Sequence, residues 1–129
     1  MSADNGDEIK VNTLGAKVRI RLERAREEIH ARAQAAVAEC ARAIVEQARA
    51  DCPVASGRLR DSIGAEVSFD PSTGIIEARV YADAPYAAAV ELGRGRSAPQ
   101  PFLFPTLERQ GSRLPEMVRS SLALLMNDL

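Results

Sequence analysis

The chain has 129 residues, the size of a single domain, and it is 46% hydrophobic and 27% charged, as ordinary globular proteins are. Its net charge of −1 provides no overall field that would draw it to nucleic acid or to an acidic membrane. The longest apolar runs are five residues, far short of the roughly 20 that a membrane span needs. We expect a flexible, polar lead over residues 1–10, without the apolar core of a secretory signal, and one domain over residues 11–129.

Residues with metal-binding or catalytic chemistry are scarce. Cys40 and Cys52 lack the paired spacing of a zinc site, and on one helix they would lie about 18 Å apart, too far for a disulfide. We expect Cys40 in the core and Cys52 as a semi-exposed thiol. We expect His30 as a surface residue, because its neighbours at helical spacing, among them Glu27 and Gln34, make no acid–base triad and no ligand cluster. The sequence therefore predicts no enzyme, no cofactor, no metal and a reducing compartment.

Apolar side chains recur at steps of three and four from residue 11 to residue 50, among them Leu14, Val18, Leu22 and Ile29. This spacing predicts one long helix that Pro53 ends. Such a helix of about 38 residues would be roughly 57 Å long, against a diameter of roughly 36 Å for a compact chain of this size. We therefore expect its first half to pack on another molecule, with Ile29 as a candidate self-association contact.

The middle of the chain predicts a hairpin. Ser56 and Gly57 mark a turn, and residues 63–69 and 76–81 then alternate apolar and polar side chains around a five-residue loop. A short helix over Tyr86–Leu92 should follow and stop at Gly93, with Val90 and Leu92 docking it on the hairpin.

The last helical region covers residues 102–127, and Gly111 and Pro115 should kink it or split it in two. The expected class is therefore α+β, with a long N-terminal helix, a small antiparallel sheet built on the hairpin, a short helix and a C-terminal helix.

The segment Gly93–Ser97 is the one local basic patch, with Arg94 and Arg96 between glycines. Two arginines on such a loop could contact phosphates, or they could pair with carboxylates of a neighbouring protein. The patch lacks aromatic residues for base stacking, which weighs against a nucleic-acid site.

Three stretches carry a family resemblance: Cys52–Ile63 (CPVASGRLRDSI), Tyr86–Gly93 (YAAAVELG) and Pro99–Leu107 (PQPFLFPTL). Together, in this order and spacing, they resemble the small head–tail joining or tail-completion (neck) proteins of long-tailed phages of the lambdoid type. Thr106 stands where the family usually has Ala, and Pro115 falls inside the last helix. The matching residues are Pro53, Ser56, Gly57, Leu59, Tyr86, Glu91, Gly93, Pro101, Phe102 and Pro105.

The resemblance implies a non-enzymatic virion protein of the neck or tail end, assembled in the bacterial host cytoplasm as a ring, a hexamer or a dodecamer. It implies as partners the chain itself and the neighbouring connector or stopper, tail terminator or tail-tube proteins, with DNA passing through the channel. Prophages and gene-transfer particles carry the same kind of protein. The alternative is a small nucleic-acid-binding protein that uses the Arg/Gly loop, and the net charge of −1 argues against it.

Overall fold

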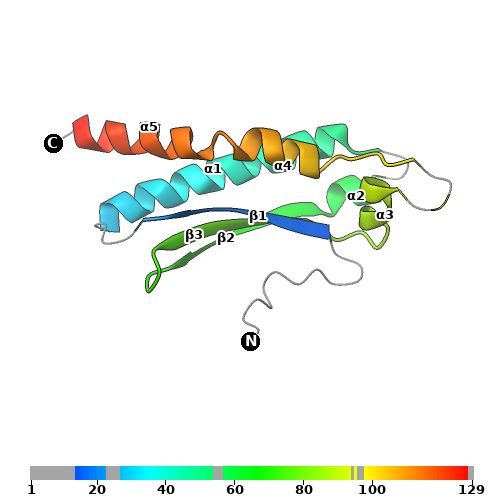
Figure 1. The fold of residues 1–129 in the computed structure, drawn as a ribbon, viewed down its shortest axis with the longest axis horizontal. Helices are drawn as coiled ribbons and strands as arrows, with labels where there is room; N and C mark the ends of the chain where they lie inside the picture. Colours follow the sequence, from blue (N-terminus) through cyan, green and yellow to red (C-terminus); the bar gives the residue numbers. More distant parts are fainter. Residues whose placement is uncertain (1–13, 23–26, 54–56, 94, 96–97, 128–129) are drawn as a thin grey trace.

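The structure is a computed structural model that describes residues 14–22, 27–53, 57–93, 95 and 98–127. It is an α+β fold in which helices cover one face of a three-stranded antiparallel sheet (Figure 1). The predicted fold class is confirmed. The elements in chain order are β1 (Leu14–Arg21), α1 (Glu27–Asp51), α2 (Arg58–Asp61), β2 (Ile63–Asp70), β3 (Ile75–Ala82), α3 (Ala87–Leu92), α4 (Phe104–Gly111) and α5 (Leu114–Asn127).

The first described element is a strand, and the prediction of a helix over this stretch is wrong. β1 pairs antiparallel with β3 from Leu14↔Ala82 to Arg21↔Ile75. The helix begins only at Glu27, and its 25 residues make it about 37 Å long, close to the expected diameter of the domain. The proposed self-association of an overhanging helix therefore loses its basis, and Ile29 is a half-buried residue in the first turn of α1.

The physical reason lies in the spacing of the apolar residues. Leu14, Val18 and Leu22 are four apart, and an even separation keeps side chains on one face of a strand as well as on one face of a helix. Ala16 and Ile20 fill the intervening even positions, so the stretch alternates apolar and polar residues and suits a half-buried strand. Pairing with β3 then satisfies the backbone groups that β3 would otherwise leave unpaired at a sheet edge.

The core lies between α1 and the inner face of the sheet. The small side chains on α1 let the helix approach the sheet closely. Cys40 is 1% exposed, as predicted, whereas Cys52 is 3% exposed and is not the semi-exposed thiol that we expected. Burial raises the pKa of both thiols. The buried residues of α1 are Ala33, Ala36, Val37, Cys40, Ala41, Ile44, Val45 and Ala48, and those of the sheet include Ile63, Ile76, Ala78, Val80 and Ala82.

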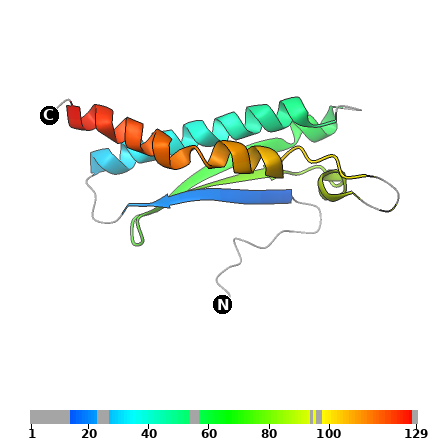
Figure 2. The ribbon, with the colours of Figure 1, turned by 45° about the horizontal axis from the view of Figure 1, so that its top comes forward.

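The hairpin of β2 and β3 is confirmed, and so is the split of the last helical region. α4 ends at Gly111 and α5 starts at Leu114. Pro115 is the second residue of α5, within the first turn, where a helix needs no backbone N–H from it. Figure 2 shows α4 and α5 beside α1 on the same face of the sheet, so that the opposite face carries no described helix.

Candidate functional site

The centre of the candidate site is Glu91, a buried carboxylate that ties α3 to the start of α4. Glu91 Oε1 accepts hydrogen bonds from the backbone N–H groups of Phe102 (3.0 Å) and Leu103 (2.9 Å), and Oε2 accepts one from Phe104 (2.9 Å). The side chain of Leu103, the N-cap residue, does not cap α4. The first N–H groups of a helix lack partners within that helix and favour a negative charge, so Glu91 does from another element what a capping side chain usually does. We call this arrangement the Glu91 clamp.

The Glu91 clamp closes the base of the loop between α3 and α4. The N–H of Gly93 donates to the Ala89 carbonyl at 2.8 Å, and the N–H of Gln100 donates to the Val90 carbonyl at 2.8 Å. Gly93 has φ 77° and ψ 152°, a conformation that is essentially confined to glycine, which accounts for glycine where α3 ends. The chain therefore leaves α3 and returns to it within a few residues.

Apolar side chains are exposed around the Glu91 clamp. Leu92 is 61% exposed, Tyr86 is 38% exposed and Phe104 is 36% exposed. Leu92 thus does not dock α3 on the hairpin as predicted, whereas Val90 is half-buried against the core. All three exposed residues belong to the end of the molecule where α3 and the start of α4 lie (Figure 1). We call Tyr86, Leu92 and Phe104 the apolar end.

The exposed side chains stand on a buried base. Phe102 is 1% exposed and Leu103 is fully buried, so the segment that follows the loop is anchored in the core immediately before Phe104. Pro101 and Pro105 flank this anchor and are exposed, and each restricts the backbone at its own position. The third motif of the sequence therefore presents Phe104 on a fixed backbone.

The first motif forms the passage from α1 to the sheet. Pro53 is half-buried just beyond α1, and Gly57 is the N-cap of α2 with φ 79°. The Gly57 carbonyl accepts the N–H of Asp61 at 3.0 Å, and Leu59 is 3% exposed in the core. This motif supports the fold, and Ser56 lies outside the described residues.

His30 has a structural role that the sequence did not predict. Its Nε2–H donates to the Leu22 carbonyl at 2.7 Å, and its ring lies against Phe69 with centroids 4.7 Å apart. It therefore joins the start of α1 to the chain just beyond β1 and to the end of β2. It is a half-buried packing residue and not a plain surface residue.

The basic loop is only partly described. Arg94 and Arg96 lie outside the described residues, and Gly95 between them is exposed. In the part of the chain that the structure covers, no three His, Cys, Asp or Glu side chains come together as a metal site would require. None of the described helices is long and apolar enough to cross a membrane.

The fold and the Glu91 clamp define an α+β protein in which a buried carboxylate holds the backbone between α3 and α4 in place. A comparison with known protein families then identifies the family of the chain. Residues 16–93 match the family HK97-gp10_like, described as "Bacteriophage HK97-gp10, putative tail-component", and the chain belongs to this family. This confirms the resemblance that the three motifs indicated. No curated protein and no solved structure shows significant similarity to the chain.

Proposed function

We propose that the protein is a non-enzymatic virion component that forms a ring at the neck or tail end of a long-tailed phage-like particle and completes the tail or joins it to the head. The observation that carries the proposal is the apolar end, held on the Glu91 clamp, in a chain that belongs to a family of phage tail components. Exposed apolar side chains on a rigid backbone are what an assembly contact needs.

The fixed backbone of the apolar end lowers the entropy cost of binding a partner there. Association costs free energy because side chains and loops lose freedom when they bind. The Glu91 clamp and the buried Phe102 remove part of that freedom before a partner arrives. Aromatic anchors such as Phe104 contribute strongly to binding when a partner excludes water from them.

The Arg/Gly loop lies between Gly93 and Gln100 in the sequence, and these two residues hydrogen-bond to the Ala89 and Val90 carbonyls of α3. Arg94 and Arg96 would pair with carboxylates of an adjacent subunit or of a neighbouring ring, where the planar guanidinium group sets register as well as energy. The double change Arg94→Glu with Arg96→Glu tests this contact. Heads and tails that accumulate apart support it, whereas joined particles that deliver DNA poorly indicate that the arginines face DNA in the channel. Normal infectious particles would show that the loop is only a linker.

The apolar end is tested by complementation of particles that lack the protein, with unattached heads and tails counted by electron microscopy. Leu92→Asp should leave heads and tails apart. Leu124→Asp is the matched control, because Leu124 is 62% exposed against 61% for Leu92 but lies on α5. The melting temperatures of both variants should stay close to that of the wild type, since exposed substitutions cost little. Normal joining by the Leu92 variant would overturn the role of this surface, and normal joining without the protein would overturn the proposed function.

A further inference from the structure

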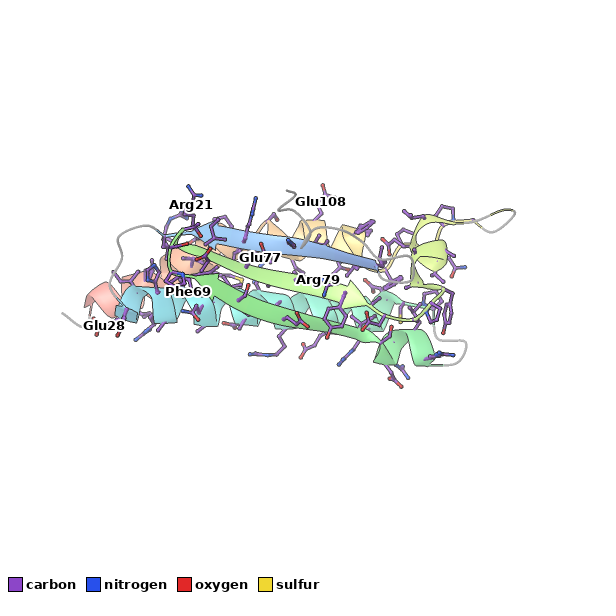
Figure 3. The ribbon with its side chains drawn as sticks, turned by 90° about the horizontal axis from the view of Figure 1, so that it is seen from below. Arg21, Glu28, Phe69, Glu77, Arg79 and Glu108 are labelled. Carbon is purple, nitrogen blue, oxygen red and sulfur yellow. The ribbon has the colours of Figure 1, made fainter. Side chains whose placement is uncertain are left out.

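The edge strand β2 ends the sheet on one side. The strand order is β1-β3-β2, and β2 pairs with β3 without interruption over all eight of its residues. Figure 3 shows the open face of the sheet, with β1 and β2 at its two sides and Phe69 labelled on β2. An edge of this kind is a template on which another extended segment can add as a further strand.

Two hydrogen bonds show which backbone groups of β2 face outward. The N–H of Asp83 donates to the Ser62 carbonyl at 3.2 Å, so this carbonyl faces the chain that follows β3. The next carbonyl, that of Ile63, accepts a hydrogen bond from the Arg49 side chain at 2.7 Å and therefore points away from β3. Arg49 thus covers the outward side of β2 at its first residue.

The rest of this edge has no such cover. Backbone groups face alternate sides along an antiparallel strand, so the N–H and C=O groups of Ala65, Val67 and Phe69 point outward, as the Ile63 carbonyl does. In the part of the chain that the structure describes, β2 pairs with β3 alone, and these outward groups form no hydrogen bond. Each of the three residues therefore offers one donor and one acceptor to a neighbour.

The same edge exposes an apolar side chain. Val67 is 41% exposed, and it is the only large apolar residue on a described strand that is exposed to this degree. Its side chain lies on the face of β2 that is turned toward the helices, the face on which Ile63 is buried. Val67 is exposed because no described strand lies beyond β2, and a strand added there would cover it.

The segment directly before β1 has the pattern of such a strand. Residues 8–13 (EIKVNT) lie outside the described residues, so only their sequence enters the argument. Ile9, Val11 and Thr13 are β-branched and alternate with polar residues, which is the pattern of a strand with one apolar face. The chain therefore carries both an open strand edge and a short segment that suits it.

This segment cannot lie along the β2 edge of its own copy. Leu14, Ala82 and Ile63 lie in one row across the sheet, so a strand beyond β2 would lie three strand spacings, about 14 Å, from Leu14. A chain spans at most about 3.6 Å per residue, so Val11, three residues before Leu14, reaches no farther than about 11 Å. An edge that receives residues 8–13 therefore belongs to a second copy.

We propose that residues 8–13 of one copy add as a fourth strand to the β2 edge of the next copy. Side chains that stand opposite each other share a face, so Ile9 and Val11 lie beside Val67 on the helix side, whereas Lys10 lies on the open face. The outward groups of β2 bind the backbone of the segment, and the alternate apolar side chains give the contact its specificity.

The contact is directional. Each copy gives a segment at one place and receives a segment at another, which makes the arrangement head-to-tail. Head-to-tail contacts generate rings where the rotation between copies closes. The inference rests on the ring of the proposed function and supplies the contact between its subunits, which is separate from the head–tail contact.

Sedimentation velocity of the purified full-length chain, over a range of concentrations, tests the segment. The wild type should form assemblies larger than a dimer. Ile9→Asp with Val11→Asp should weaken association at least about tenfold, because two charges are then buried against the apolar side of the edge. Lys10→Ser with Asn12→Ser is the matched control on the other face of the segment and should change association by less than about threefold.

A second pair of variants tests the receiving edge. Val67→Pro removes an N–H that points outward, so no hydrogen bond to β3 is lost, and it should weaken association at least about tenfold. Val67→Thr keeps the N–H and the β-branched shape and should associate nearly as the wild type does. A mixture of the Val67→Pro chain with the Ile9→Asp, Val11→Asp chain should give dimers and nothing larger, because only one contact can form. Thermal melts check that each variant is folded.

Disulfides test the pairing directly. Val11→Cys with Val67→Cys should give a ladder of linked oligomers on oxidation, and Val11→Cys with Ala65→Cys gives it if the register differs by two residues. Val11→Cys with Glu66→Cys is the control and should give no ladder, because these two side chains lie on opposite faces. A linked monomer in place of a ladder would show that the segment binds its own copy.

A wild type that stays monomeric at every concentration, association that survives Val67→Pro, or a linked monomer without a ladder would overturn the exchange of segments. Failure of the proposed function has a different signature. Particles that join normally with the Ile9→Asp, Val11→Asp chain would remove this contact and leave the head–tail role. Normal joining without the protein would remove the head–tail role and leave the contact.

Discussion

The Glu91 clamp makes the sharpest energetic prediction. Glu91→Ala removes the acceptor of three backbone N–H groups. Phe102 and Leu103 are buried, so water does not replace the lost carboxylate at their N–H groups, whereas Phe104 is 36% exposed and part of its loss is recovered by solvent. Each unsatisfied buried donor costs about 1–3 kcal/mol, and the lost negative charge at the start of α4 costs up to about 1 kcal/mol more.

We therefore expect Glu91→Ala to lower the free energy of unfolding by about 3 kcal/mol. For a chain of 129 residues this corresponds to a melting temperature lower by about 11 °C. Glu91→Gln keeps the shape and one oxygen, which can still serve Phe102 and Leu103, but its amide turns a donor toward the Phe104 N–H. It should cost about half as much.

Thermal melts together with amide hydrogen exchange measure both effects. Glu108→Ala is the control, because Glu108 is an exposed acid on the same helix and its loss should cost less than about 0.5 kcal/mol. In the wild type the amides of Phe102 and Leu103 should exchange slowly, and in Glu91→Ala they should exchange fast. Equal protection of these amides in both proteins, with melting temperatures within about 2 °C, would refute the role of the clamp.

Three further predictions concern the scaffold. Gly57→Val should lower the free energy of unfolding by about 1–2 kcal/mol, because Gly57 has φ 79°, which a β-branched residue resists. Arg58→Ala at an exposed position should lower it by less than about 0.5 kcal/mol, and equal melting temperatures of the two variants would contradict this. Hydrogen bonds from the following turn lower the pKa of Asp70, so its stabilising effect is present above the ordinary value of 3.8 and is lost as the pH falls through the lowered pKa. Asp70→Ala should flatten the acid side of a plot of melting temperature against pH, and an unchanged acid side would contradict it. Burial raises the pKa of Cys40 and Cys52, so both thiols should react with Ellman's reagent much more slowly in the folded than in the unfolded chain, and fast labelling of Cys52 would show that it is not buried.

Most elements of the fold can be predicted from the sequence, and the main wrong prediction is a helix in place of β1. The hairpin, α3 and the break between α4 and α5 follow from local signals, namely alternation, glycine and proline. The sequence analysis predicts a helix in place of β1 because the four-residue spacing of Leu14, Val18 and Leu22 fits both a helix and a strand. Ala16 and Ile20 complete an apolar–polar alternation that fits only a strand. Counting matches to both templates over residues 14–22 would have found the third strand.

The Glu91 clamp could not be found from periodicity. Glu91 lies 11 residues before Phe102, and its burial depends on how α3 and the start of α4 meet in space. The family motif marks Glu91 as notable but does not say that its carboxylate caps a helix. The exposure of Leu92 also depends on packing. A leucine at the end of a short helix is expected in the core, and only the structure shows that it faces solvent.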